Sequence, residues 1–418
     1  MMGMQPSREK PSSNPAGPLA GIRVLDLSAF IAGPYGCTLL GDLGADVIKI
    51  EPPAGDTVRQ YPSTLPHESR AYLGLNRSKS SLVLDLKKPE GLDILLRLVG
   101  SADVLVHNFR PSVPARLGID YDRLCKINPR LIYCAVTGFG ETGPYRERAG
   151  YDQLLQAMTG ICALQGPDAD HPEIVWGSVV DYYTSSMLAY AVSSALFHRE
   201  RTGRGQAIGV SLLQSAMTMQ SARIVAADGE PRDVDRDFRS MGTTGIYPTA
   251  EGHLYLTTTA PHFWEAFCEL VGLAELARDS RYDTVRKRAD RASELLPRIR
   301  EALKIRTARE WEAILGDRVP CAAVGTIPDL FDHPQALAQG LICDLEHPGL
   351  GRYRGFGRPV TFSESVCSAP SGAPAFGQHS RDVLAGHGFS TDEIDRFVAD
   401  GVIKTGGTDR SSVKSASS

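Results

Sequence analysis

The sequence predicts an α/β protein with a doubly wound parallel sheet in a large domain and a second, smaller α+β domain. Three observations lead to this prediction. Short β-branched runs alternate with helical segments from Gly21 onward. After about residue 225 the pattern changes to a hairpin followed by charged amphipathic helices. Two more strands and two more helices are indicated towards the C-terminus, and we expect them to return to the large domain.

The alternation in the large domain is typical of a parallel sheet with helices on both faces. Its expected strands are apolar runs of five to seven residues at 22–27, 45–51, 81–86, 103–107 and 131–136. Helices are expected at 33–44, 89–100 and 121–128, and a long, nearly uncharged helix follows Asp181. In the smaller domain we expect a hairpin at 245–259, helices at 281–304 and 307–316, and a strand at 319–325.

The domain boundaries follow from these changes of pattern. We assign 19–227 and 336–404 to the large domain and 228–335 to the smaller one. The polar ends of the chain, 1–18 and 405–418, have the composition of disordered tails.

Composition and charge exclude several function classes. The chain has 418 residues, of which 42% are hydrophobic, enough for two or three domains. A net charge of -4 argues against nucleic acid as a partner, because phosphate binding needs a basic face. No apolar run approaches the ~20 residues of a membrane span. The eight cysteines include no C-x-x-C pair, so we expect no metal site and reduced thiols in a cytoplasmic enzyme, or one of an organelle matrix in a eukaryote.

Familiar catalytic motifs are missing from the sequence. There is no G-x-S-x-G elbow, no P-loop and no H-E-x-x-H. The first strand leads into a turn with only Gly33-x-x-Gly36, which fits a tight turn better than a dinucleotide site.

Two loops have the composition of a ligand site. Lys87 and Lys88 precede Pro89 at an expected helix start, where free N–H groups and lysines suit an anion; solvated lysines at a turn fit the pattern equally well. The second loop, "HNFRPSVPARLG", follows an expected strand and holds Asn108, Phe109, Arg110 and Arg116. Arginine can stack on adenine and pair with phosphate, and open sheets bind ligands at such an edge.

Asp181 has two interpretations. It precedes a run with no charged residue before His198, so it could cap a helix and would then stay ionised. A carboxylate nucleophile would need the same ionisation and a fixed orientation. Pattern alone favours the cap.

Several blocks of sequence, in order, resemble the class III CoA-transferases, the CaiB/BaiF-like family of the formyl-CoA and carnitine CoA-transferases and the α-methylacyl-CoA racemases. They include "LDLSAFIAGPYGCTLLGDLGADVIKIEPPAGD", "DVLVHNFRP", "GIDYDRLCKINPRLIYCAVTGFGETGPY" and "HRERTGRGQ". The resemblance implies that Asp181 is the nucleophile. It implies CoA contacts at Ile31, Ala32, Leu84, Asp85, Leu86, Lys87, Asn108, Phe109, Arg116, Thr137, Gly138, Phe139 and Gly140. Family members often carry glutamine at Ile31 and lysine at Thr137.

The resemblance also implies a reaction and a set of partners. CoA would pass from an acyl-CoA, for example succinyl-CoA, to a small carboxylic acid through an aspartyl mixed anhydride and an aspartyl-CoA thioester, without metal or bound cofactor. Gly242 and Gly245 would belong to a loop that faces the reaction, and two chains would form an interlocked homodimer. Racemases of this fold carry histidine in A-G-H-D where this chain has Tyr151, whose pKa of ~10 does not suit a base. The racemase is the first alternative, and a CoA-binding protein without activity is the second.

Overall fold

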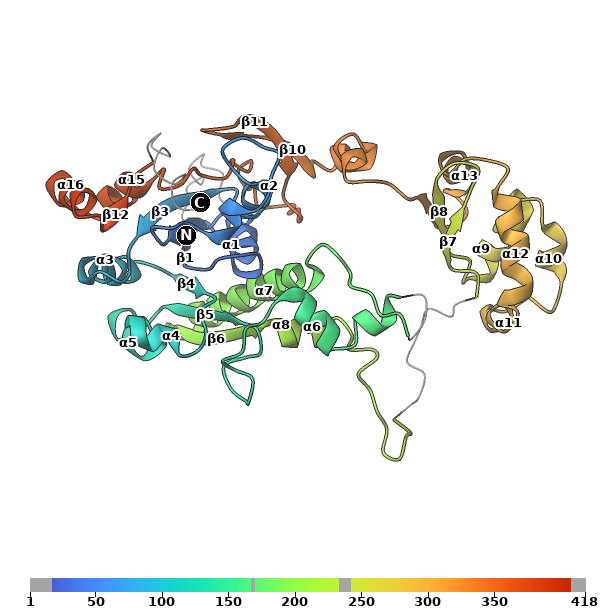
Figure 1. The fold of residues 1–418 in the computed structure, drawn as a ribbon, viewed down its shortest axis with the longest axis horizontal. Coiled ribbons are helices and arrows are strands. Elements are labelled where there is room, and N and C mark those ends of the chain that lie inside the picture. Colours follow the sequence, from blue (N-terminus) through green and yellow to red (C-terminus); the bar gives the residue numbers. More distant parts are fainter. Residues whose placement is uncertain (1–16, 167–169, 233–241, 407–418) are drawn as a thin grey trace, which may run out of the picture. The chain divides into compact units, whose positions relative to one another are not determined.

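The structure is a computed structural model that describes residues 17–166, 170–232 and 242–406. It divides into two compact units (Figure 1). The larger unit takes the chain up to Val225 and again from Ala338 onward, and the smaller unit is Ala226–Leu337. Most of the two expected tails, 1–16 and 407–418, lies outside the described residues.

A seven-stranded sheet forms the centre of the larger unit, in the order β12-β3-β2-β1-β4-β5-β6. Its strands are β1 (Arg23–Asp26), β2 (Asp46–Glu51), β3 (Lys79–Leu84), β4 (Val104–His107), β5 (Ile132–Thr137), β6 (Gln206–Ser211) and β12 (Ile403–Lys404). Every neighbouring pair is parallel except β12 with β3. The predicted parallel α/β sheet is therefore confirmed, and the C-terminal β12 closes one edge of it.

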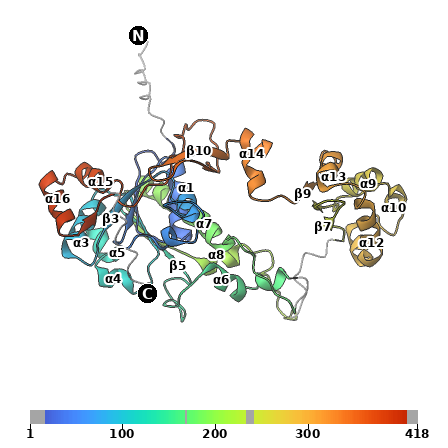
Figure 2. The same cartoon turned by 45° about the horizontal axis from the view of Figure 1, so that its top comes forward.

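Helices cover both faces of this sheet because its strands are apolar on both sides. Leu25 and Leu105 belong to one core, under α3 (Pro89–Val99), α5 (Tyr121–Ile127), α15 (Ser380–Gly386) and α16 (Thr391–Ala399). Val24 and Val104, one residue away in each strand, belong to the other core, under α1 (Ala32–Asp42) and α7 (Val179–Thr202). Figures 1 and 2 show these two sets of helices on opposite faces.

The packing of α1 on α7 explains the long uncharged run after Asp181. A Cβ on Gly36 of α1 would lie 2.9 Å from Leu188 Cδ1, so glycine lets the two helices approach closely. The Ser185 hydroxyl of α7 donates a hydrogen bond of 2.8 Å to the carbonyl of Ala32. Helix α7 is thus fixed to the first turn of α1.

Several short elements of the larger unit have too few residues for a periodic pattern. They are the helices α2 (Arg70–Leu75), α4 (Val113–Leu117), α6 (Asp152–Met158) and α8 (Leu212–Thr218), and the 3₁₀ turns η1 (Thr57–Gln60) and η2 (Cys162–Leu164). The short helix α14 (Pro334–Ala338) spans the boundary between the two units. The two expected C-terminal strands, β10 (Ile342–His347) and β11 (Gly351–Phe356), pair antiparallel with each other and form a sheet of their own. They do not extend the central sheet.

The smaller unit contains the expected hairpin. β7 (Gly245–Pro248) and β8 (His253–Leu256) pair antiparallel, and β9 (Cys321–Ala323) adds a third strand. The helices are α9 (Pro261–Leu270), α10 (Ala274–Arg278), α11 (Val285–Asp290), α12 (Ala292–Leu303) and α13 (Ala308–Leu315), with η3 (Pro328–Phe331) after them. The helix expected at 281–304 is thus two helices, and Trp264, Phe267 and Trp311 fill the core of the unit. Within the described ranges, no helix combines the length and apolar composition that crossing a membrane requires.

Candidate active site

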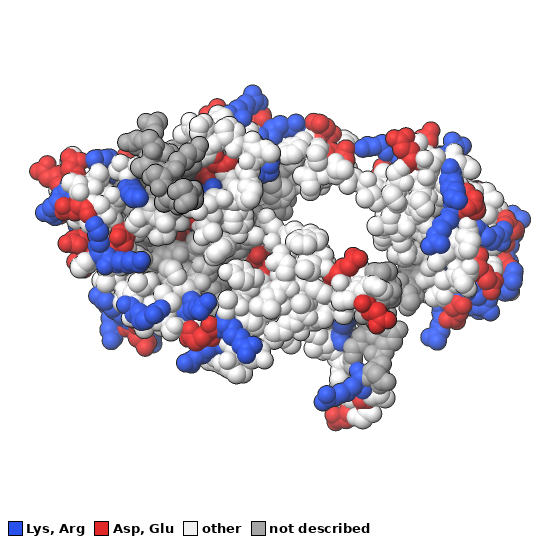
Figure 3. Space-filling view, viewed as in Figure 1, with Lys and Arg blue, Asp and Glu red and all other residues white. Residues whose placement is uncertain are grey.

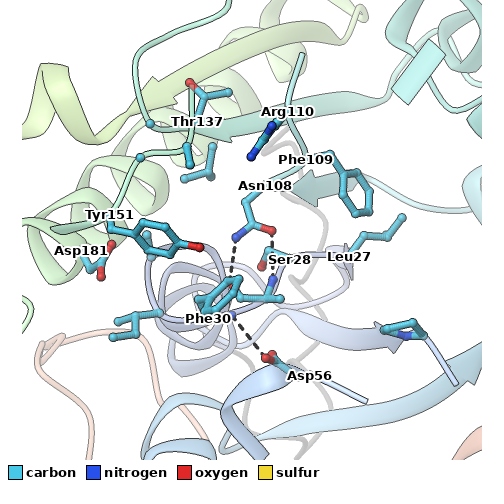
Figure 4. A pocket seen from close by; sticks show the side chains of 18 of the residues that line it. Leu27, Ser28, Phe30, Asp56, Asn108, Phe109, Arg110, Thr137, Tyr151 and Asp181 are labelled. Carbon is cyan, nitrogen blue, oxygen red and sulfur yellow. Dashed lines mark hydrogen bonds between the residues drawn. The ribbon is translucent and has the colours of Figure 1, made fainter. Parts of the chain in front are cut away.

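A cavity of about 950 Å³ opens at the carboxyl ends of the parallel strands. Residues that follow β1, β2, β3, β4 and β5 line it, together with Ser178 and Asp181 of the α7 region (Figure 4). The chain turns in opposite directions from β1 and β4, which are neighbours in the sheet, and open α/β sheets bind ligands at such a switch point. The cavity therefore lies where this fold is built to hold a ligand.

The loop after β1 is held in a strained conformation at the cavity wall. Phe30 has φ of 66°, a left-handed conformation that a bulky residue rarely adopts. The side-chain amide of Asn108 accepts from Ala29 N at 3.0 Å and donates to Ala29 O at 2.7 Å, and Phe30 N donates to Asp56 Oδ1 at 3.3 Å. Figure 4 shows these bonds as dashed lines. Two loops thus fix the Phe30 turn from either side, and such strain is typical of functional sites.

Two buried ion pairs stabilise the loop that follows β1. Lys49 Nζ lies 2.8 Å from Asp56 Oδ2 and donates to Ser28 O at 2.9 Å, while Lys79 Nζ lies 2.8 Å from Asp26 Oδ2. Burial by itself would raise the pKa of Asp26, but the charges of Lys79 and Lys49 lower it to about 2. Asp26 is therefore ionised, and each charged group of these two pairs has a buried partner of opposite charge.

Asp181 lies half-buried in the first turn of α7 and lines the cavity. The interpretation of Asp181 as a helix cap is wrong, because the cap position is Ser178, in a left-handed conformation and without a side-chain cap bond. The expectation that Asp181 stays fully ionised is also corrected. Burial, and then the charge of Asp152, raise the pKa of Asp181 to about 7.

Asp152 supplies the cap that α7 lacks. Its Oδ2 accepts hydrogen bonds from Val180 N at 2.6 Å and from Asp181 N at 3.0 Å. Gln156, also buried, donates to Asp152 Oδ1, and exchanges two bonds of 2.9 Å with the backbone of Val175. The first turns of α6 and α7 are thus joined at Asp181.

A close backbone contact places α6 beside the end of β5. A Cβ on Gly138 would lie 2.6 Å from the Cα of Gly150, so neither residue can carry a side chain without displacing the other. The tetrapeptide Ala149-Gly150-Tyr151-Asp152 is held there, and all four residues line the cavity. The Tyr151 ring meets the edge of Phe30 with centroids 6.1 Å apart, and Figure 4 shows Tyr151 and Asp181 on the same side of the cavity.

The cavity brings together most of the residues that the sequence nominated. Those that line it are Asp181, Ile31, Ala32, Leu84, Asp85, Leu86, Lys87, Asn108, Phe109, Thr137 and Gly138. Lys88 does not line it, and its ammonium donates to the carbonyl of Asp400. Arg110, which the loop composition had suggested, lines it as well.

Five residues that the family resemblance nominated are not among those that line the cavity. Arg116 is exposed at the end of α4 and does not line the cavity. Phe139 and Gly140 do not line it either, and Phe139 packs in the core shared by α6, α7 and α8. Gly242 and Gly245 belong to the smaller unit. Their roles stay predictions.

Several lining residues had no signal in the sequence. Tyr61, Arg146 and Arg148 belong to loops whose course depends on tertiary contacts, and Asp152 is the first residue of the short helix α6. The family pattern A-G-x-D marks the position of Asp152 but gives no role for it. Among the described residues, no three His, Cys, Asp or Glu side chains gather as they would around a metal ion.

Comparison with known proteins identifies the fold and its chemistry. The family model for CoA-transferase family III matches residues 19–380. The chain belongs to this family. The succinate–glutarate CoA-transferase of Agrobacterium fabrum is 34% identical over 88% of this chain and 95% of its own length. The human succinyl-CoA:glutarate CoA-transferase is 31% identical over 91% of this chain and 89% of its own.

Solved structures agree with this assignment. A CaiB/BaiF family protein from Brucella suis superposes with a TM-score of 0.79 at 31% identity, and covers 89% of this chain and all of its own. Class III CoA-transferases are enzymes that transfer CoA, and this chain is one of them. The resemblance noted in the sequence is thereby confirmed, and the relatives do not favour the racemase.

Proposed function

We propose that this enzyme transfers CoA from an acyl-CoA to a free carboxylic acid, with Asp181 as the nucleophile. The observation that carries the proposal is the position of Asp181, a carboxylate fixed in the first turn of α7 at the wall of a cavity at the carboxyl edge of the sheet. A carboxylate nucleophile needs this combination of fixed geometry and partial desolvation.

The steps balance without any other reactant. The Asp181 carboxylate attacks the thioester carbonyl and expels CoA thiolate, which leaves a mixed anhydride. The thiolate attacks the carbonyl of Asp181 in that anhydride, releases the donor acid and forms an aspartyl-CoA thioester. The acceptor carboxylate attacks this thioester and expels the thiolate, and the thiolate then attacks the acceptor carbonyl. Acyl-CoA and free Asp181 result, and the thioester bond energy is conserved without ATP, metal or permanent cofactor.

The cavity offers groups for the nucleotide end of CoA. Lys87, in the loop after β3, and Arg110, in the loop after β4, are cations that suit phosphate groups, and Phe109 offers a ring to the adenine. Ile31, Ala32, Thr137 and Gly138 line the same cavity as Asp181. We assign the CoA contacts to these residues and to Leu84, Asp85, Leu86 and Asn108.

Succinyl-CoA is the donor that the relatives support best. The human and mouse relatives are named succinyl-CoA:glutarate CoA-transferases, and a Chloroflexus aurantiacus relative is named for succinyl-CoA and D-citramalate. These names pair succinyl-CoA with another di-acid. A small dicarboxylic acid is accordingly the acceptor class that we propose.

The surface of α7 supports a homodimer. Tyr182, Tyr190 and Phe197 follow one another at helical spacing and are 41%, 68% and 65% exposed. Figure 3 shows few charged side chains over α6, α7 and α8. Exposed aromatic rows on a surface so poor in charge are typical of subunit contacts.

The experiment is an acceptor screen. Purified protein is mixed with succinyl-CoA and a panel of mono- and dicarboxylic acids, in the presence of EDTA and without ATP, and new acyl-CoA is detected by mass spectrometry. We expect transfer to at least one dicarboxylic acid. A requirement for ATP or Mg²⁺ with every acid would indicate a ligase instead. Deuterium uptake by a chiral 2-methylacyl-CoA in D₂O would indicate the racemase, which needs a base where this chain has Tyr151.

A further inference from the structure

Helix α7 begins without a cap of its own. Ser178 holds a left-handed φ of 59° and makes no side-chain cap bond, although the first turn of the helix carries Asp181. The free N–H groups of a helix start need acceptors, and an acceptor from another element fixes the helix to that element. At α7 that acceptor comes from α6.

We propose that Asp152 is the positioning residue of Asp181: its carboxylate caps α7 from α6, fixes the backbone of the nucleophile and lies beside its side chain. The inference rests on the proposed role of Asp181. The two carboxylates are linked through the backbone, since Asp152 Oδ2 lies 3.0 Å from Asp181 N and 2.6 Å from Val180 N. Asp152 is 2% exposed, so water does not compete for these bonds.

Gln156 and an apolar core hold Asp152 in place. The Gln156 amide donates both to Asp152 Oδ1 and to Val175 O, and its carbonyl accepts from Val175 N. Leu155 and Val180, each next to one of these polar groups in sequence, pack in one buried cluster. The cap is therefore one side of a rigid contact between α6 and α7.

The cap also has an electrostatic consequence. The titratable groups that interact with Asp181 are Asp152 from α6, Tyr61 from the segment after η1 and Tyr182 from α7 itself. Burial raises the pKa of both tyrosines, so they stay neutral near pH 7. Of these three groups only Asp152 brings negative charge near neutral pH, and this charge favours the protonated form of Asp181. The same charge makes the ionised Asp181 a stronger base and hence a better nucleophile.

Two substitutions separate the cap from the charge. Asp152→Asn keeps an oxygen for the N–H groups and removes the charge. We expect the acidic limb of kcat/KM against pH to move down by about one pH unit. Asp152→Ala removes both, and we expect kcat to fall about ten- to a hundredfold, with KM for acyl-CoA within about twofold of wild type. Asp120, which caps α5 through Arg123 N at 3.1 Å, supplies the control. Asp120→Asn should leave the limb unchanged.

The outcomes are decisive. An unshifted limb in Asp152→Asn, or wild-type kcat in Asp152→Ala, overturns the inference. Asp152→Asn could place its side-chain NH₂ group against the NH₂ group of Gln156 and fail to fold. In that case the Gln156→Met variant tests the inference. It keeps the bulk but not the hydrogen bonds, so kcat should fall, and kcat within about twofold of wild type overturns the inference. Asp181→Asn separates the two proposals. If that variant stays active the proposed function fails, whereas an inactive Asp181→Asn with an unshifted limb in Asp152→Asn refutes the role of Asp152 alone.

Discussion

At the scale of single residues, the proposed role of Asp181 as the nucleophile makes activity depend on its protonation. Its pKa is raised to about 7 by burial and by the charge of Asp152, whereas an exposed aspartate titrates near ~3.9. A carboxylate attacks a thioester only when ionised. In the proposed mechanism the raised pKa makes ionised Asp181 a stronger nucleophile, but a smaller fraction of Asp181 is ionised near neutral pH.

The raised pKa of Asp181 predicts how kcat/KM depends on pH. kcat/KM for acyl-CoA should fall as the pH drops through about 7, tenfold per pH unit below the midpoint, because one proton on Asp181 blocks attack. Initial rates between pH 5 and 9 at constant ionic strength test this. A profile that stays flat down to pH 5 would mean that Asp181 titrates as an exposed aspartate does.

The same shift predicts that Asp181 costs stability. The pKa of Asp181 is higher in the folded protein than in the unfolded chain. Between about pH 4 and 7 the carboxyl of Asp181 is therefore protonated in the folded protein and ionised in the unfolded chain. The free energy of unfolding consequently falls as the pH rises through that window. Asp181→Asn should therefore melt higher than wild type at pH 8, by about 2 °C for ~1 kcal/mol, with a smaller gain at pH 5. Calorimetry at both pH values measures this, and a variant that melts lower at pH 8 would contradict it.

At the scale of elements, the sequence predicted the regular strands and helices and missed what joins them. The strand runs at 45–51 and 131–136 agree with β2 and β5 to within one residue at each end, because apolar alternation needs no tertiary information. The cap of α7 was assigned to Asp181, yet it comes from Asp152, 29 positions before Asp181. No local pattern reports a bond between residues so far apart, and α6 itself is too short to show a period.

The Gly138–Gly150 contact gives a prediction at this scale. Gly150→Ala should push α6 away from β5 and lower the free energy of unfolding by about 2 kcal/mol or more, with loss of activity. Gly74 in α2 is the matched control, since a Cβ there meets nothing within 4 Å. Gly74→Ala should raise stability by up to about 1 kcal/mol through helix propensity. Urea denaturation compares the two, and equal effects would refute the contact.

At the scale of the whole molecule, the sequence indicated that the C-terminal part of the chain returns to the larger unit, but not which strand joins the edge of the central sheet. The pattern placed two C-terminal strands in the large domain, whereas the two residues of β12 are the ones that pair with β3. A strand of two residues has no alternation to detect. Tyr190 and Phe197 of the nearly uncharged α7 are largely exposed, because a lack of charged residues does not show which side chains of a helix are covered.

The exposed row on α7 predicts association. We expect a dimer in sedimentation velocity at micromolar concentration, and we expect Tyr190→Asp with Phe197→Asp to weaken it at least tenfold, since a charge would be buried in an apolar contact. Tyr190→Phe keeps the ring and should associate as wild type does. A wild-type protein that sediments as a monomer at every concentration would contradict the proposed dimer.

The account as a whole rests on a covalent bond to Asp181. Wild-type protein is incubated with succinyl-CoA and hydroxylamine, digested and analysed by mass spectrometry, with Asp181→Asn treated in parallel. We predict loss of activity and a hydroxamate on Asp181 alone in the wild type, because hydroxylamine attacks aspartyl anhydrides and thioesters but not free carboxylates. Wild-type protein that turns over succinyl-CoA, keeps its activity in hydroxylamine and yields only unmodified Asp181 would contradict the account.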